Sequence, residues 1–164
     1  MVWTPEPTYP KAEISVRATT LHYRIVAPIM LPFLDRRLLN LFRCRTSKCF
    51  FQRNREHPPA GKEFDTLVHL EPVAQKNGRT ERYLYVESAE EIVACATVQT
   101  VEFHGWGSRA GTIETPDRLV IDLDPAPRLD FDKLKDAAFQ LHRSFEAVGL
   151  ESFALGAPLL PRLR

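Results

Sequence analysis

The sequence predicts an α+β domain in which helices flank a mixed or antiparallel sheet. Residues 67–74 and 81–86 have the composition of strands, and the Asn-Gly pair at 77–78 between them is a strong hairpin signal. Residues 118–123 are β-branched and aliphatic, which predicts a further strand. Apolar residues at steps of three and four over residues 131–148 indicate an amphipathic helix.

Length and composition are those of one ordinary globular domain. The chain has 164 residues, of which 44% are hydrophobic and 26% charged. Its net charge of +1 gives no global signal for nucleic acid, so any basic surface must be local. Three cysteines cannot all pair and their spacing fits no zinc site, which favours a reducing cytoplasm. No signal peptide or membrane-spanning run is evident, so we expect no membrane partner.

The first helix is expected from residue 15 to about residue 34, after an irregular lead over residues 1–13. Pro28 and Pro32 are expected to kink this helix, end it, or start a second short one. The helical spacing is carried by Leu21, Ile25, Ile29 and Phe33.

Capping signals mark two later helices. Ser88 with Glu91 three residues on forms a capping box. Asp130 is the expected N-cap of the 131–148 helix, and Gly149 its C′ residue. A further strand is expected to begin at residues 150–153.

His104 is expected at the end of a short strand, residues 101–104, that runs into a glycine-rich loop at residues 105–109. A histidine in that position is compatible with a structural role and with a catalytic one.

The most informative feature is the acid pair Asp122 and Asp124 at the end of the 118–123 run. Alternate residues of a strand share a face, so the two carboxylates would lie about 6–7 Å apart at their Cα atoms. Two acids that close repel unless a cation or proton lies between them, which indicates a Mg²⁺ or Mn²⁺ site for phosphoryl transfer. The plainer alternative is a turn, which aspartate also favours.

Residues 36–55 form a basic segment without a single acid. Cations interleaved with phenylalanines suit a surface that follows a phosphate backbone and stacks a base. The alternative is a core strand with arginines on its wet face. The segment's cations are Arg36, Arg37, Arg43, Arg45, Lys48, Arg53 and Arg55, and its aromatic residues are Phe42, Phe50 and Phe51.

Taken in order, these features resemble the polymerase domain of bacterial DNA ligase D, a member of the archaeo-eukaryotic primase superfamily. The likeness covers about residues 21–153, which would be the N-terminal part of a primase-like polymerase fold. Four blocks carry it: residues 26–32, 49–53, 102–109 and 116–125.

The resemblance implies a DNA-repair nucleotidyltransferase that adds nucleotides at DNA ends in non-homologous end joining. Asp122 and Asp124 would be the catalytic ligands of Mn²⁺ or Mg²⁺. His104 would act at the incoming nucleoside triphosphate, with Ser108 and Arg109 also binding the nucleotide.

The same resemblance implies a nucleic-acid surface that prefers DNA ends with a 5′-phosphate. Phe50 and Phe51 would stack on the template, and Arg43 and Arg53 would contact phosphates. Ku and a ligase domain or chain are the partners implied, and the bacterial nucleoid the location. The family's 5′-phosphate-binding lysine falls near Val16, where the neighbouring Arg17 is the candidate.

The chain departs from the family after residue 153. The expected Ser-Gly-x-Lys-Gly-x-His loop and a third metal-binding aspartate are missing, and residues 154–164 read as an aberrant tail. Our hypothesis is a frameshift or misplaced stop. We therefore expect truncation and weak or absent activity, so whether this chain is an enzyme stays open.

Two other functions are compatible with the residues. One is a non-catalytic DNA-end-binding remnant. The other is a haloacid-dehalogenase-like phosphatase, with Asp122 as nucleophile and Asp124 as general acid. That family favours Gly or a hydroxyl residue directly after the pair, where this chain has Pro125 and Ala126.

Overall fold

The computed structural model describes residues 15–45, 48–55, 64–126 and 129–155, and it has the α+β architecture predicted. The chain divides into two compact units, Met1–Leu119 and Val120–Arg164, and each is described by itself. The irregular lead at residues 1–13 and most of the predicted tail lie outside the described residues. Among the described helices, none is long and apolar enough to cross a membrane.

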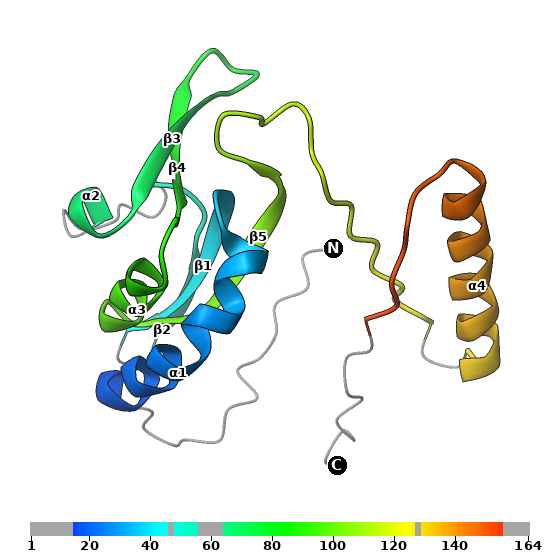
Figure 1. Cartoon of the computed structure of the whole chain (residues 1–164), viewed down its shortest axis with the longest axis horizontal. Coiled ribbons are helices and arrows are strands. Elements are labelled where there is room, and N and C mark those ends of the chain that lie inside the picture. Colours follow the sequence, from blue (N-terminus) through cyan, green and yellow to red (C-terminus); the bar gives the residue numbers. More distant parts are fainter. Residues whose placement is uncertain (1–14, 46–47, 56–63, 127–128, 156–164) are drawn as a thin grey trace. The chain divides into compact units, whose positions relative to one another are not determined.

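A five-stranded antiparallel sheet forms the centre of the first unit (Figure 1). The strand order is β2-β1-β4-β3, and β5 pairs with the other edge of β1. Strand β1 pairs with three strands, β2, β4 and β5, so its register sets the positions of residues on all three. The strands are β1 (Arg37–Arg45), β2 (Lys48–Gln52), β3 (His69–Ala74), β4 (Thr80–Tyr85) and β5 (Thr100–Arg109).

Helices α1 (Val16–Leu34) and α3 (Ala89–Thr97) pack together over one face of this sheet, and a short α2 (Phe64–Leu67) precedes β3 (Figure 1). The main core lies between the two helices and the sheet. Its fully buried members include Ala27, Leu39, Leu41, Leu84, Val86, Ile92, Cys95 and Ala96.

Helix α1 continues through both prolines, so neither proline ends the helix or starts a second one. Pro28 and Pro32 lie on the exposed side of the helix. Because proline has no N–H, the carbonyls of Arg24 and Pro28 lose their helical donors. Both residues are exposed, so water can satisfy these carbonyls. Ser15 caps the helix by accepting from the backbone N–H of Ala18 at 3.2 Å.

The buried face of α1 differs from the apolar stripe noted in the sequence. Tyr23, Ala27 and Leu34 point into the core, and the Tyr23 hydroxyl donates to the Val101 carbonyl at 2.7 Å. Both sides of α1 are apolar, so periodicity establishes the helix without telling which side is inside. The stripe residues are all exposed: Leu21, Ile25, Ile29 and Phe33.

The predicted hairpin is confirmed as β3 and β4, with Gly78 in the left-handed region at φ 78°. The predicted loop at residues 105–109 is wrong, because β5 continues to Arg109. Pairing of Gly105 with Leu39, and of Arg109 with Arg37, gives these residues backbone partners that a glycine-rich sequence does not reveal.

Both predicted helix caps are confirmed. Ser88 accepts from the Glu91 backbone N–H at 3.2 Å, while the Glu91 carboxylate accepts from the Glu87 N–H. In the second unit, α4 (Phe131–Ala147) begins after the N-cap Asp130 and ends before Gly149, at φ 78°.

The strands predicted at residues 118–123 and 150–153 are absent, and both stretches lack regular structure. No strand among the described residues pairs with either one, and a strand exists only where a neighbour completes its ladder. Leu119, Val120 and Ile121 are exposed as a result, with Val120 at 77%.

The cysteines also differ from expectation. Cys44 and Cys49 lie directly opposite each other on β1 and β2 and form a disulfide, a pairing that the sequence analysis did not predict. Cys95 is free and buried in the core, and burial raises the pKa of its thiol to about 12.

Candidate nucleic-acid interface

The face of the sheet opposite α1 and α3 carries a row of polar and aromatic side chains. Strand alternation places Leu39 and Leu41 in the core, so Asn40 and Phe42 point the other way. The register of β5 sets His104 beside Asn40. We call this surface, defined by Asn40, Phe42, Phe51, His104 and Trp106, the open face.

Phe51 joins two parts of the open face. Its ring is edge-on to the His104 imidazole, with centroids 5.3 Å apart, and lies 4.9 Å from the Phe42 ring. Phe51 remains 38% exposed, so one side of this aromatic platform is accessible. Such rings are the usual stacking surface for unpaired bases.

Glu102 orients His104. Its Oε2 lies 2.8 Å from His104 Nε2, two positions along the same strand and on the same face. An ionised carboxylate only accepts hydrogen bonds, so this contact places a proton on Nε2. Both side chains are exposed, which leaves the imidazole accessible to a ligand.

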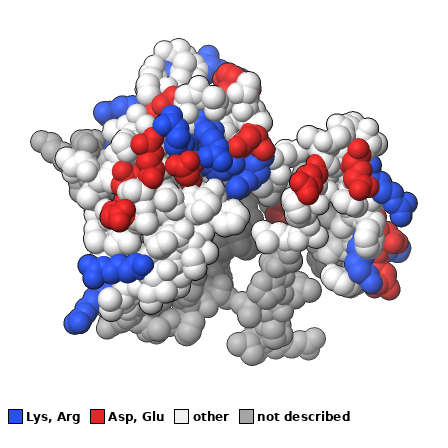
Figure 2. Space-filling view, in the orientation of Figure 1, with Lys and Arg blue, Asp and Glu red and all other residues white. Residues whose placement is uncertain are grey.

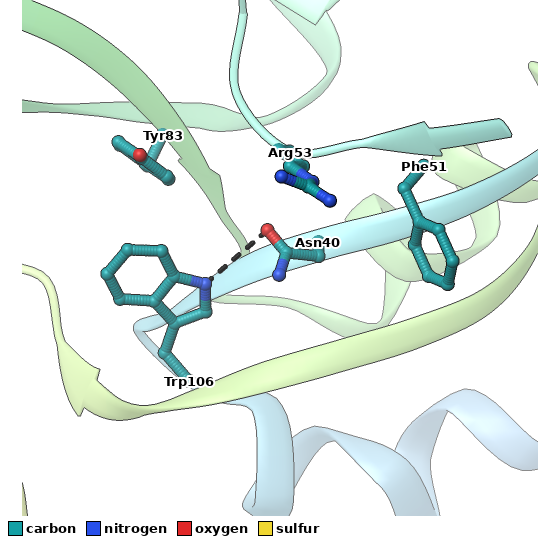
Figure 3. A pocket seen from close by; sticks show the side chains of 5 residues that line it. All are labelled: Asn40, Phe51, Arg53, Tyr83 and Trp106. Carbon is teal, nitrogen blue, oxygen red and sulfur yellow. Dashed lines mark hydrogen bonds between the residues drawn. The ribbon is translucent and has the colours of Figure 1, made fainter. Parts of the chain in front are cut away.

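A cavity of about 440 Å³ opens beside the platform, and Figure 3 shows its lining. Strands β1, β2, β4 and β5 each contribute a lining residue. Trp106 packs against a small buried cluster formed by Leu38, Tyr83 and Ala110. Tyr83 and Trp106 pack edge to face, with centroids 4.8 Å apart. The lining residues are Asn40, Phe51, Arg53, Tyr83 and Trp106.

Phe50 and Arg43, both predicted to contact nucleic acid, lie on the opposite side of the sheet from Phe51. Arg43 is 1% exposed and lies 5.6 Å from the centre of the Phe50 ring. Its guanidinium donates to Gln52 Oε1 at 3.0 Å and to the Val98 carbonyl at 2.9 Å. The geometry gives Arg43 a place in the core, so we leave it out of the interface.

Ser108 and Arg109, predicted to bind the nucleotide, are engaged within the protein. The Ser108 hydroxyl donates to the Ile113 carbonyl at 2.8 Å. Arg109 bridges Asp35 and Asp117, with its Nε 2.9 Å from Asp117 Oδ2. In Figure 2, Lys and Arg side chains lie next to Asp and Glu side chains on the face of the molecule that is shown.

Asp117 ties the end of β5 to the start of β1. Its second oxygen accepts from the Arg37 guanidinium at 2.6 Å, and the Arg37 side chain is 4% exposed. Hydrogen bonds from Arg37 and Arg109 lower the pKa of Asp117 from 3.8 to about 2. Gly107 lets the chain pass closely here, because a Cβ at Gly107 would meet the carbonyl oxygen of Arg118.

Asp122 and Asp124 lie in the second unit, exposed in a stretch without regular structure. Within the described residues, no group of three His, Cys, Asp or Glu side chains gathers as a metal site. Two accessible carboxylates still fit a hard cation such as Mg²⁺, which keeps several waters and takes further oxygens from substrate phosphates. The role of this pair as metal ligands stays a prediction.

Arg17, the candidate for the 5′-phosphate, is exposed in the first turn of α1.

Sequence reasoning assigned no role to Asn40, Glu102 or Trp106. The signal for Glu102 was present, because an acid two residues from a histidine on a strand shares its face. Asn40 and Trp106 depend on strand register, which no local pattern in the sequence reveals.

Comparison with known proteins shows what the chain is similar to. The multifunctional non-homologous end joining protein LigD of Pseudomonas aeruginosa is 34% identical over 104 residues. The match covers 63% of this chain and 12% of that protein's length. A family model for the primase-polymerase domain of LigD matches residues 17–156. The chain therefore belongs to the LigD primase-polymerase domain family.

Proposed function

We propose that the chain is a DNA-repair nucleotidyltransferase that binds DNA ends on the open face and acts in non-homologous end joining. The observation that carries the binding part is the exposed Phe51 ring set against His104, with the cation Arg53 close by. Aromatic rings that stack bases, next to a cation for the backbone, are the usual equipment of single-strand binding.

For the chemical step we propose Asp122 and Asp124 as ligands of Mg²⁺ or Mn²⁺. The family is metal-dependent. The bound ion would offset the charge of the triphosphate and favour attack by a primer 3′-hydroxyl. His104, whose Nε2–H is held by Glu102, would donate from Nδ1 to a phosphate oxygen of the incoming nucleotide when the imidazole carries both protons. Ku and a ligase domain or chain are the proposed partners.

A second candidate is DNA-end binding with little or no catalysis. The observation behind it is the small donor set, since residues 118–126 carry two carboxylates, Asp122 and Asp124, and no third potential ligand gathers with them among the described residues. A two-metal site normally uses more protein ligands than this. We therefore expect nucleotide addition to be weak.

Primer extension tests the catalytic part. The 164-residue chain is incubated with Mn²⁺, nucleoside triphosphates and a gapped duplex carrying a 5′-phosphate. We expect slow addition that Asp122→Asn abolishes and that Asp136→Asn, an exposed aspartate of α4, leaves unchanged. Slow addition that survives Asp122→Asn contradicts the metal assignment, and rapid addition by the unmodified chain contradicts the expectation of weak activity.

A gel shift tests binding separately. We expect the duplex with a single-stranded end to be retained at low salt and released as salt rises, because phosphate contacts release counterions. Removal of the 5′-phosphate should weaken binding, and so should Arg17→Ala. No shift at any salt concentration would refute the proposed function in both its forms.

A further inference from the structure

The cavity beside the aromatic platform has three lining residues to which the family resemblance assigned no role: Asn40, Tyr83 and Trp106. Its polar side chains include two that offer hydrogen-bond donors, Asn40 and Arg53. It opens on the open face and measures about 440 Å³, within the usual range for small-ligand sites. Figure 3 shows Tyr83 and Trp106 on one side, Phe51 on the other, and Asn40 and Arg53 between them.

Trp106 fixes which way the Asn40 amide points. The indole Nε1–H can only donate, and it lies 3.4 Å from Asn40 Oδ1. The amide oxygen is thus taken up by the indole, and the Nδ2 hydrogens are left as donors. Within the described residues, no acceptor lies within hydrogen-bond distance of Asn40 Nδ2, so these donors are available to a ligand.

Arg53 adds further donors at the same opening. The residue is exposed, and no carboxylate in the described part of the chain is within ion-pair distance of its guanidinium. A guanidinium carries five N–H donors and no acceptor. The polar groups of Asn40 and Arg53 that face a ligand therefore donate and do not accept.

Three aromatic side chains form the apolar part of the cavity lining. Trp106 and Tyr83 close one side as a packed pair, and Phe51 borders the other. Flat apolar walls with a polar edge between them suit a planar heterocycle that can stack and hydrogen-bond at once.

We propose that this cavity binds one unstacked base of a single DNA strand and prefers guanine. Guanine presents two adjacent acceptors, O6 and N7, on one edge, whereas adenine and cytosine present an amino donor there and thymine a single acceptor. Asn40 and Arg53 would donate to O6 and N7 while the ring stacks between the aromatic walls. The proposal rests on the proposed function, since it specifies what the DNA-binding face selects.

Fluorescence anisotropy with labelled nine-nucleotide strands tests this preference. Three 5′-phosphorylated strands are compared: nine deoxyadenosines, the same strand with a central deoxyguanosine, and the same strand with a central 7-deaza-deoxyguanosine. We expect the deoxyguanosine strand to bind about fivefold tighter or more, as a bidentate base contact allows. The 7-deaza strand lacks the N7 acceptor and should lose most of that gain.

Asn40→Asp is the discriminating variant. It keeps an oxygen for the Trp106 indole but replaces the two amide donors with an acceptor, so the preference for deoxyguanosine should disappear or turn toward deoxyadenosine. Asn77→Asp, the same change at the turn of the β3–β4 hairpin, keeps the oxygen that accepts from the Arg79 backbone N–H and does not line the cavity, so it should retain the preference. Circular dichroism confirms that both variants fold.

The outcomes separate the two proposals. Equal binding of all three strands overturns the guanine site and leaves the DNA-binding function standing. Loss of binding to every strand at low salt overturns both. A guanine preference that persists unchanged in Asn40→Asp also overturns the assignment to this cavity.

Discussion

Phe51 of β2 and His104 of β5 meet edge to face across β1, with ring centroids 5.3 Å apart. Neither strand pairs with the other, and both are held by their register on β1. The contact thus depends on backbone hydrogen bonds, so the open face keeps its arrangement without help from a ligand.

Removing the exposed ring should weaken DNA binding. Phe51→Ala is expected to cost about 1–3 kcal/mol of binding free energy, the usual value of one base-stacking aromatic. The measurement is anisotropy with a labelled single strand at low salt. Phe33→Ala, which removes a more exposed ring from α1, is the control and should leave the affinity unchanged. Equal losses in the two variants would argue against a platform.

Arg43 should matter for folding rather than for DNA. Arg43→Met leaves the Gln52 side-chain oxygen and the Val98 carbonyl without their guanidinium donor in a buried site. We expect a loss of about 3 kcal/mol in the free energy of unfolding, seen as a lower midpoint in thermal or urea unfolding. At a temperature where the variant is folded, its DNA affinity should match that of the parent. A selective loss of DNA binding there would return Arg43 to the interface.

Asp117 should make stability fall in acid. Its pKa is about 2 in the folded protein and 3.8 ordinarily, so its contribution is complete above pH 3.8 and is lost as the pH falls toward 2. Nearly half of the side chain is exposed, so the contribution is moderated by solvent. Asp117→Asn should flatten the acid limb of a stability–pH curve, whereas Glu114→Gln should not. A curve unchanged by Asp117→Asn would mean that the pair with Arg37 is weak.

The two sides of α1 should respond very differently to truncation. Leu34→Ala removes a buried side chain and should cost about 2–5 kcal/mol of stability. Ile29→Ala shortens a side chain that is 71% exposed and should change stability by less than about 0.5 kcal/mol. Urea unfolding of both variants measures this. The opposite ranking would mean that the stripe seen in the sequence is the inner face after all.

Local chemistry was predictable from this sequence, and tertiary partners were not. Ser88, Asp130 and Gly149 mark helix ends through their own side chains or backbone freedom, so the caps were found. The Asn-Gly turn gave the hairpin for the same reason.

The misses share one physical cause. Residues 118–123 have the composition of a strand, but a strand also needs a neighbouring strand to pair with. The local sequence does not show whether such a partner exists. Register decides that Phe51 faces outward with His104 while the adjacent Phe50 faces inward. The roles of Asn40 and Trp106 required the same information.

The bond between Cys44 and Cys49 has a consequence for the whole open face. These residues are exact partners across β1 and β2, so the bond prevents the two strands from sliding past each other. A shift of one position would turn the Phe51 ring under the sheet and bring the Phe50 ring out. The disulfide between β1 and β2 therefore keeps Phe51, and not Phe50, on the open face.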